Sequence, residues 1–179
     1  AGSSIHKAWP YVDVAALELL RLTPARLVFV GGPECAPLEE SIALRLIGWH
    51  DMPDGLEKQA LGKASVADLK PRVDERWPKR VSFTSGRWTI RQSLAFAQIA
   101  DVVIGSETGV LNAVCLEPNH KVIMLSHSSR ENLTKHWRNT TALEPPAGAC
   151  PQQPCHRLHY AFDFCKRDEA TGAAACAAA

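Results

Sequence analysis

Residues 100–125 read ADVVIGSETGVLNAVCLEPNHKVIML, and this stretch decides the fold because two apolar runs enclose a short polar segment. Residues 100–104 and 121–125 are rich in β-branched side chains, as is typical of parallel strands buried on both faces. Helical spacing over residues 110–116 completes a strand, loop, helix, strand unit. In such sheets ligands bind beyond the carboxyl ends of the strands. We therefore expect residues 106–109 to lie in a ligand pocket.

The rest of the chain repeats this alternation of helices and strands. We expect helices over residues 12–22, 38–49 and 90–99, and strands over residues 27–30 and 81–83. Periodicity is weak between residues 50 and 78, where residues 65–69 suggest a short strand or turn. The alternation favours an α/β fold with a doubly wound parallel sheet over an all-α or an all-β fold.

Composition limits the organisation and the partners of the chain. Its 179 residues, 46% of them hydrophobic, suit one main domain with an appendage, and we place these at residues 1–145 and 146–179. A formal net charge of +1 gives no reason to expect a nucleic-acid partner. No apolar run approaches the roughly 18 to 20 residues that span a bilayer, and no signal sequence is visible, so we expect a soluble, cytoplasmic protein.

Three loops carry polar residues suited to a nucleotide. The first, GSSIHKAWP over residues 2–10, offers the hydroxyls of Ser3 and Ser4 and the ammonium group of Lys7. These groups would donate hydrogen bonds and positive charge to a diphosphate. A capped helix with a solvated lysine would explain the same residues.

The second loop is Gly31-Gly32-Pro33-Glu34, which follows the first expected strand. Gly32 would let the backbone approach a ligand, and Glu34 would meet a ribose hydroxyl. A tight turn with a glutamate at the positive end of a helix explains the loop equally well. The glycine spacing does not match a dinucleotide-binding fingerprint.

The third loop crowds a carboxylate, a hydroxyl and a glycine at the mouth of the expected sheet. Glu107 would accept hydrogen bonds from sugar hydroxyls, while Thr108, Gly109 and the following N–H groups would hold a phosphate. Asn112, one helical turn later, would face the same space. Helix capping would also explain Thr108.

Taken together, these segments resemble the carboxyl-terminal, donor-binding half of the family-9 glycosyltransferases, over residues 2–143. That family includes the lipopolysaccharide heptosyltransferases and has the two-domain, Rossmann-like GT-B architecture. The matching positions are Ser3, Ser4, Lys7, Trp9, Pro10, Gly31, Gly32, Glu34, Glu107, Thr108, Gly109 and Ala113. Two positions depart from the family pattern, because Glu107 replaces the usual Asp and Asn112 replaces the usual His.

The resemblance implies metal-independent transfer of a sugar, such as a heptose, from a nucleotide diphosphate to a saccharide or lipid-linked saccharide. A lipid-linked acceptor would bring the protein close to a membrane surface. No further cofactor is implied. Lys7 would be catalytic by stabilising the departing diphosphate, together with Ser4 and Thr108. The family's general base and acceptor pocket belong to an amino-terminal domain, so we expect this chain to be a fragment that binds nucleotide without turnover.

The last thirty residues hold a separate group of four cysteines: Cys150, Cys155, Cys165 and Cys176. They would bind Zn²⁺ or form two disulfides, although the spacing C-x4-C-x9-C-x10-C is looser than in paired C-x2-C zinc knuckles. A reducing cytosol disfavours disulfides.

Two other functional classes stay open beside the transferase. One is a nucleotide-binding module without catalysis, which the substitutions at Glu107 and Asn112 favour. The other is a structural or interaction domain whose cysteines hold a metal or a partner.

Overall fold

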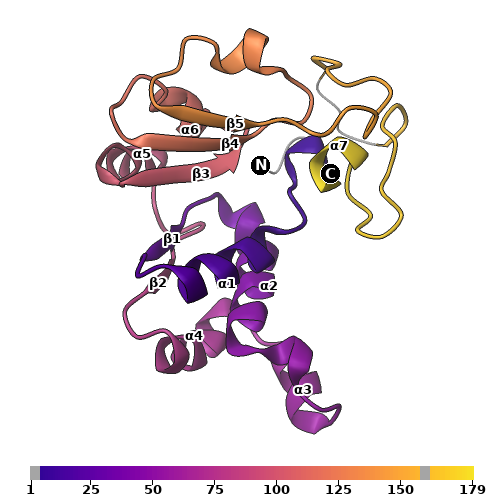
Figure 1. Ribbon diagram of the computed structural model, residues 1–179. Coiled ribbons are helices and arrows are strands. Elements are labelled where there is room, and N and C mark those ends of the chain that lie inside the picture. The colour runs from indigo at the N-terminus through magenta and orange to yellow at the C-terminus, as the bar shows by residue number, and fades with distance from the viewer. Residues whose placement is uncertain (1–4, 158–161) are drawn as a thin grey trace. The chain divides into compact units, whose positions relative to one another are not determined.

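A computed structural model of the chain describes residues 5–157 and 162–179 (Figure 1). The chain forms two compact units. We call Tyr11–Trp88 the helical unit, and Ala1–Pro10 together with Thr89–Ala179 the sheet unit. The boundary that we expected between residues 145 and 146 falls inside the sheet unit. Within the described residues the fold is mixed α/β, with one two-stranded and one three-stranded sheet, both parallel.

The helical unit packs three main helices beside a short sheet. Its elements are α1 (Val12–Leu22), β1 (Leu27–Phe29), η2 (Pro33–Cys35), α2 (Ala36–Ile47), η3 (Trp49–Asp51), α3 (Leu56–Leu61), α4 (Val66–Arg76) and β2 (Val81–Phe83). Helix α2 contacts both α1 and α4, and β1 pairs with β2. The core that they share consists of Ala16, Leu20, Ile42, Ala43, Leu46, Leu69, Val73, Val81 and Phe83. The expected helices at 12–22 and 38–49 and both expected strands are confirmed, with ends shifted by at most two residues.

Helix α4 corrects the expectation of a strand or turn at residues 65–69. Ser65 is its N-cap and accepts from the Asp68 amide, while the Asp68 side chain accepts from the Ser65 amide. This reciprocal pair is a capping box, which satisfies two amides that a helix leaves free at its start. The Ser-x-x-Asp spacing was visible in the sequence, but Pro71 inside the helix and its many charged residues weakened the periodic pattern.

The sheet unit is built around three parallel strands. Its elements are η1 (Ile5–Lys7), α5 (Ile90–Ile99), β3 (Val102–Ser106), α6 (Gly109–Ala113), β4 (His120–Met124), the π-helical turn η4 (Arg130–Thr134), β5 (Thr140–Leu143) and α7 (Ala175–Ala178). The strand order is β3-β4-β5. Leu111, Ile123, Leu125 and Ala142 form the core on one face of this sheet. The expected β-loop-α-β unit is confirmed, whereas β5 was not predicted.

Strand β3 is not buried on both faces, contrary to our expectation. Val102 and Ile104 are 47% and 46% exposed, whereas Ile123 on the central strand β4 is fully buried. The reason is that successive side chains of a strand point to opposite faces: Val103 points to the face that carries the core, whereas Val102 and Ile104 point to the other face. In the described part of the chain, no helix is both long enough and apolar enough to cross a membrane.

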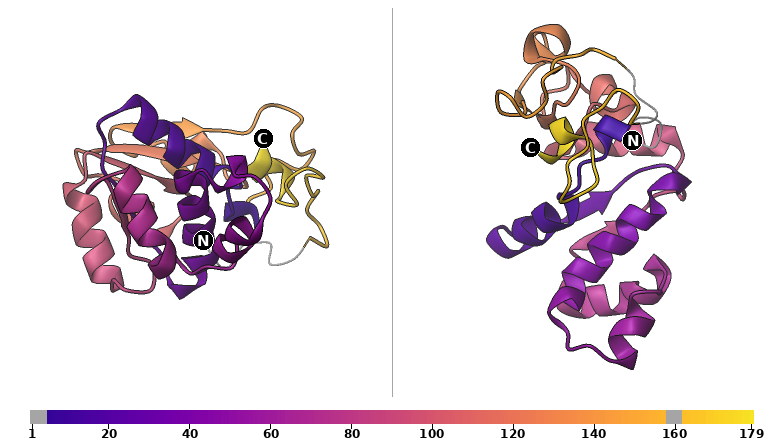
Figure 2. Two further views of the ribbon diagram at one scale, coloured as in Figure 1. Left: turned by 90° about the horizontal axis from the view of Figure 1, so that it is seen from below. Right: turned by 90° about the vertical axis from the view of Figure 1, so that its right-hand side faces the viewer.

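The segment after β5 returns to the amino-terminal turn of the same unit. Helix α7 packs against η1, and the views in Figures 1 and 2 agree in placing these two elements side by side. The backbone of the segment also bonds to the loop after β4, since the His156 amide donates to the His127 carbonyl at 2.8 Å. The segment is thereby attached at two places within the sheet unit.

Candidate functional site

The candidate site lies where β3 and β4 end. Because the two strands are parallel and Ser106 pairs with Met124, the residues that follow them emerge at one edge of the sheet. Glu107 and Thr108 follow β3, and a serine-rich loop over residues 126–129 follows β4. The sheet therefore brings two polar loops together at the edge where α/β proteins bind ligands.

Glu107 links these two loops. Its side chain is buried, and its Oε1 accepts hydrogen bonds from the amides of Ser126 at 2.9 Å and Ser128 at 3.2 Å. Its Oε2 contacts Nδ1 of His127. Both carboxylate oxygens are therefore engaged by the loop after β4. Glu107 therefore holds that loop, and its contact with a sugar hydroxyl stays a prediction.

The surroundings of Glu107 keep it ionised. Burial acts to raise the pKa of this carboxyl group, but the contact with His127 and the two loop amides outweigh it, so the pKa lies below its ordinary value. A buried carboxylate held by several donors is a poor proton donor at neutral pH. His127 was not among our predicted site residues, because nothing in the sequence pairs it with a carboxylate twenty positions earlier.

Two hydroxyl groups at this edge, those of Thr108 and Ser126, lack the hydrogen bond expected of them. Thr108 is the N-cap residue of α6, yet its side chain makes no capping hydrogen bond. Capping, the competing explanation for Thr108, is thus not observed. The Ser126 hydroxyl is buried and has no hydrogen-bond partner in the described structure. Buried polar groups normally have partners, so an unpaired hydroxyl here is a reason to look for a ligand.

Gly109 and Asn112 lie beside these hydroxyls on α6. A Cβ added at Gly109 would meet no atom within 4 Å, so the glycine faces open space. Asn112 is exposed one turn later, and its amide donates to the Thr108 carbonyl at 3.1 Å. The structure therefore brings together four of the predicted residues: Glu107, Thr108, Gly109 and Asn112.

Gly32 and Glu34 lie together in the helical unit. The Glu34 side chain is exposed and folds back over Gly32, where a Cβ would overlap the carboxylate. A second buried glutamate, Glu39 of α2, accepts from the Ser85 amide at 3.0 Å and so joins this helix to the loop after β2. Glu39 was missed because it falls within the apolar pattern of α2, and its role repeats that of Glu107.

Lys7, the predicted catalytic residue, ends the turn η1 and is partly buried. The other two residues of that predicted loop, Ser3 and Ser4, lie outside the described residues. Lys7 belongs to the same unit as Glu107 and Thr108.

The four tail cysteines are all partly buried. Burial, together with the thiols of Cys150, Cys165 and Cys155, raises the pKa of Cys176 to about 12. Among the described residues, no group of three or more Cys, His, Asp or Glu side chains is placed where it could hold a metal ion.

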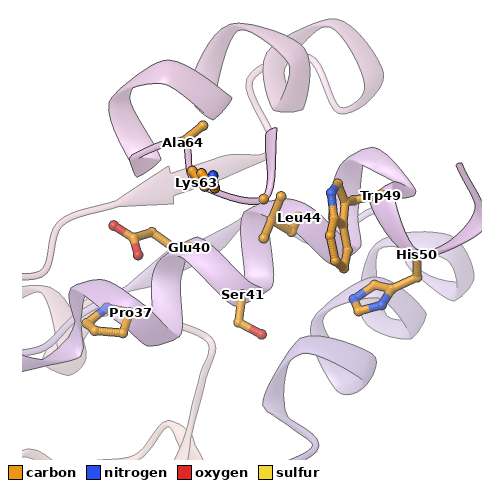
Figure 3. Close-up of a pocket in the computed structure, with 9 residues that line it drawn as sticks. Pro37, Glu40, Ser41, Leu44, Trp49, His50, Lys63 and Ala64 are labelled. Carbon is orange, nitrogen blue, oxygen red and sulfur yellow. The ribbon is translucent and has the colours of Figure 1, made fainter. Parts of the chain in front are cut away.

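A hollow of about 310 Å³ lies in the helical unit and contains none of the predicted site residues (Figure 3). Glu40, Ser41, His50 and Lys63 supply its polar side chains. Trp49 forms an apolar wall and is held by a hydrogen bond from its Nε1 to the Lys58 carbonyl at 2.8 Å. This hollow is a second place where a small polar ligand could be tested.

Comparison with known proteins finds no match to a family model, to a curated protein or to a solved structure. The resemblance to the family-9 glycosyltransferases therefore stays a prediction from the sequence motifs.

Proposed function

We propose that this chain is the donor-binding domain of a glycosyltransferase, a Rossmann-like, doubly wound half of a GT-B enzyme that binds a nucleotide diphosphate sugar. The observation that carries the proposal is the pair of hydroxyls, Thr108 and Ser126, at the carboxyl edge of β3 and β4. One is not used for capping and the other is buried without a partner. Hydroxyls in such a place are suited to donate to phosphate oxygens.

In sugar transfer from a nucleotide diphosphate, the donor-binding domain mainly has to stabilise negative charge on the leaving phosphate, and it need not transfer a proton. When a glycosidic bond to a diphosphate breaks, negative charge develops on the leaving phosphate. Fixed hydroxyl donors and the Lys7 ammonium would stabilise that charge without a metal ion. Glu107 contributes as a positioning residue, because it holds the amides of Ser126 and Ser128 and so fixes the loop that carries one of the hydroxyls.

Neither Glu107 nor Asn112 is suited to act as the general base. Glu107 is buried and ionised with both oxygens engaged, and Asn112 has no titratable group. The base that deprotonates the acceptor would come from an acceptor-binding domain outside this chain. The expected behaviour of the isolated chain is therefore nucleotide binding without turnover.

Calorimetric titration with ADP, UDP and GDP, each with and without Mg²⁺, tests the proposal. We expect saturable binding of one diphosphate that does not depend on Mg²⁺. Thr108→Val, Ser126→Ala and Lys7→Ala should each weaken it by roughly 10- to 100-fold, because a hydrogen bond to a charged group contributes about 1.5–3 kcal/mol. Failure of all three nucleotides to bind would refute the donor-domain proposal.

Lys63→Ala is the matched control because it removes the same charge from the hollow in the helical unit. It should leave nucleotide affinity unchanged. If Lys63→Ala weakened binding and Lys7→Ala did not, the nucleotide would bind in that hollow and the site proposed at β3 and β4 would be wrong.

A nucleotide-binding module without catalysis is a second candidate function. It fits Asn112, which has no titratable group, and Glu107, whose carboxylate is held by the loop after β4. A transfer assay separates the two functions once the chain is supplied together with an acceptor-binding partner domain. Nucleotide binding without any transfer in that combination would favour the module.

A further inference from the structure

His127 lies in the loop after β4 and forms a nearly buried pair with Glu107. Its Nδ1 contacts Oε2 of Glu107, and the two side chains are only 12% and 3% exposed. The amides of the residues on either side of it, Ser126 and Ser128, donate to the other carboxylate oxygen. Three consecutive residues therefore hold one carboxylate, and that carboxylate orients the imidazole ring. Enzymes commonly use such a pairing to position a histidine for work on a ligand.

The pairing decides which ring nitrogen carries the proton. Burial alone would raise the pKa of Glu107, but the hydrogen bond from His127 and the two loop amides lower it, so the carboxyl group is ionised at neutral pH. An ionised carboxylate can only accept hydrogen bonds, so Nδ1 of His127 has to be the donor. The neutral ring then keeps its proton on Nδ1 and leaves Nε2 as an acceptor. A second proton, on Nε2, makes an imidazolium that donates from both nitrogens.

Glu107 also supplies the countercharge that an imidazolium needs at this position. A charged ring that is only 12% exposed loses most of its hydration, and the burial of an unpaired charge is costly. A carboxylate in direct contact offsets this cost, because opposite charges attract more strongly away from water. The ring still keeps some exposed surface, so a ligand can reach it.

The hydroxyl groups next to this pair suit an anionic ligand. Thr108 directly follows Glu107 and makes no capping hydrogen bond, while the Ser126 hydroxyl, next to His127, is buried without a partner in the described structure. Hydroxyls can donate to anionic oxygens, and an imidazolium donates to them with a full charge. A diphosphate offers several such oxygens. Donors of both kinds are therefore available from two loops at one edge of the sheet.

Three other titratable residues lie near this loop: Arg130, Glu144 and His156. The Arg130 guanidinium donates to a carbonyl of β5 at 3.0 Å, and the Arg130 amide donates to Glu144 Oε1 at 2.8 Å. The His156 amide donates to the His127 carbonyl at 2.8 Å, and the His156 ring pairs with the Asn132 side chain. In these contacts each side chain bonds to other groups. The buried carboxylate is therefore the charged group that controls the second proton of the imidazole.

We propose that His127 binds the diphosphate as an imidazolium, which donates from Nε2 to a phosphate oxygen while Glu107 holds Nδ1. This inference rests on the proposed function and adds a second cation to it beside Lys7. When the anion binds, Nε2 of a neutral ring takes one proton from solvent. Binding of the diphosphate is therefore linked to proton uptake.

The same group would act during sugar transfer. The bond between the anomeric carbon and the phosphate oxygen breaks, and its electron pair stays on that oxygen. The acceptor oxygen forms the new bond to the carbon, and its proton goes to the base of the acceptor-binding domain. The imidazolium keeps its proton and stabilises the departing oxygen through the hydrogen bond.

Calorimetry in two buffers of different ionisation enthalpy measures the proton uptake. At a pH of about 8 the phosphates of ADP, UDP and GDP are already ionised, so a proton taken up on binding has to go to the protein. An ordinary histidine is mostly neutral there, so binding of one of these nucleotides should take up close to one proton per chain. The affinity should also fall as the pH rises from about 6 to 8.

His127→Asn separates the bond to phosphate from the contact with Glu107. The asparagine NH₂ group lies where Nδ1 lay, so it can still donate to Glu107, but nothing replaces Nε2. Hydrogen exchange should show that the Ser126 and Ser128 amides stay protected. Nucleotide binding should weaken by roughly 10- to 100-fold and lose its proton uptake. His136→Gln, which alters an exposed histidine of the same unit, should change neither.

Wild-type protein decides the question if His127→Asn fails to fold. Nitrogen NMR should show Nε2 of His127 gaining a proton when inorganic pyrophosphate is added at a pH of about 8, where the free ring is mostly neutral. An unchanged Nε2 signal in the complex with a nucleotide, or no proton uptake in the calorimeter, would overturn the role of His127.

Pyrophosphate also separates this inference from the proposed function. If pyrophosphate binds with proton uptake at His127 and none of ADP, UDP and GDP binds, the anion site stands and the donor domain is refuted. If a nucleotide binds without proton uptake, or binds equally well to folded His127→Asn, the donor domain stands and the role of His127 is wrong. Binding of neither pyrophosphate nor nucleotide would overturn both.

Discussion

Replacing Glu107 by glutamine is the sharpest test of how the candidate site is held together. The substitution keeps the shape of the side chain but removes its charge. One oxygen can still accept from the amides of Ser126 and Ser128, whereas the new NH₂ group takes the place of the oxygen that contacts His127. The two amide bonds lose their charge assistance and the contact with the imidazole is lost.

These contacts set the loss of local stability that we expect for Glu107→Gln. Hydrogen bonds to a charged group contribute about 1.5–3 kcal/mol, and neutral ones about 0.5–1.5 kcal/mol. Weakening two such bonds and removing the pairing with His127 should cost about 2–3 kcal/mol of local stability. Glu107→Ala, which leaves all three donors unpaired, should cost about 3–5 kcal/mol.

Hydrogen exchange of the Ser126 and Ser128 amides measures this loss of local stability directly. A global unfolding curve is less suitable, because the chain has two compact units that can unfold separately. In Glu107→Gln we expect these amides to exchange roughly 30- to 150-fold faster, the equivalent of about 2–3 kcal/mol. Glu131→Gln is the control, because its side chain is 79% exposed and pairs only with Lys135 among the described contacts. Less than a threefold change in Glu107→Gln would refute the role that we assign to Glu107.

The same contacts predict a dependence on pH. The pKa of Glu107 is lowered in the folded chain, so the unfolded chain binds more protons as the pH falls through the ordinary value of 4.5. The stabilisation should be complete above that pH and be lost as the pH falls through the lower folded pKa. Wild-type protection of the Ser126 amide should therefore decline in acid, whereas Glu107→Gln should show a flatter profile.

Three further substitutions test the helical unit. Arg80→Ala should lower the free energy of unfolding of this unit by about 2–3 kcal/mol, measured by urea denaturation, because the guanidinium donates to three backbone carbonyls in the last turn of α1 and the loop that follows it. A loss below about 0.5 kcal/mol would contradict this. Gly86→Ala should lower the same free energy of unfolding by about 1–3 kcal/mol. Gly86 has φ +70°, and an added Cβ would lie 3.2 Å from Pro33 Cα. An unchanged urea midpoint would show that the turn relaxes freely. Ser65→Ala should cost about 1 kcal/mol and Ser65→Asn much less, because asparagine can still accept from the Asp68 amide at the start of α4 without adding a charge beside the Asp68 carboxylate. Equal losses for the two variants would argue against the cap.

Much of the secondary structure could be predicted from local sequence. The helix Val12–Leu22, the strand Val81–Phe83 and the helix Ile90–Ile99 have the predicted bounds. Apolar spacing and helix-end signals are properties of neighbouring residues, so they are readable without a tertiary fold. Strand β5 escaped prediction because Thr140–Leu143 is short and alternates weakly, and its strand conformation depends on pairing with β4.

The sequence alone determined where polar residues follow the strands, and it placed Glu107 and Thr108 at the edge of a parallel sheet. Only the tertiary structure decided what these side chains do. The partners of Glu107 lie about twenty residues later in the chain, and the parallel pairing of β3 with β4 brings them to its carboxylate. Hydrogen bonds and charge interactions depend on distances in space, and the folding of distant segments sets those distances.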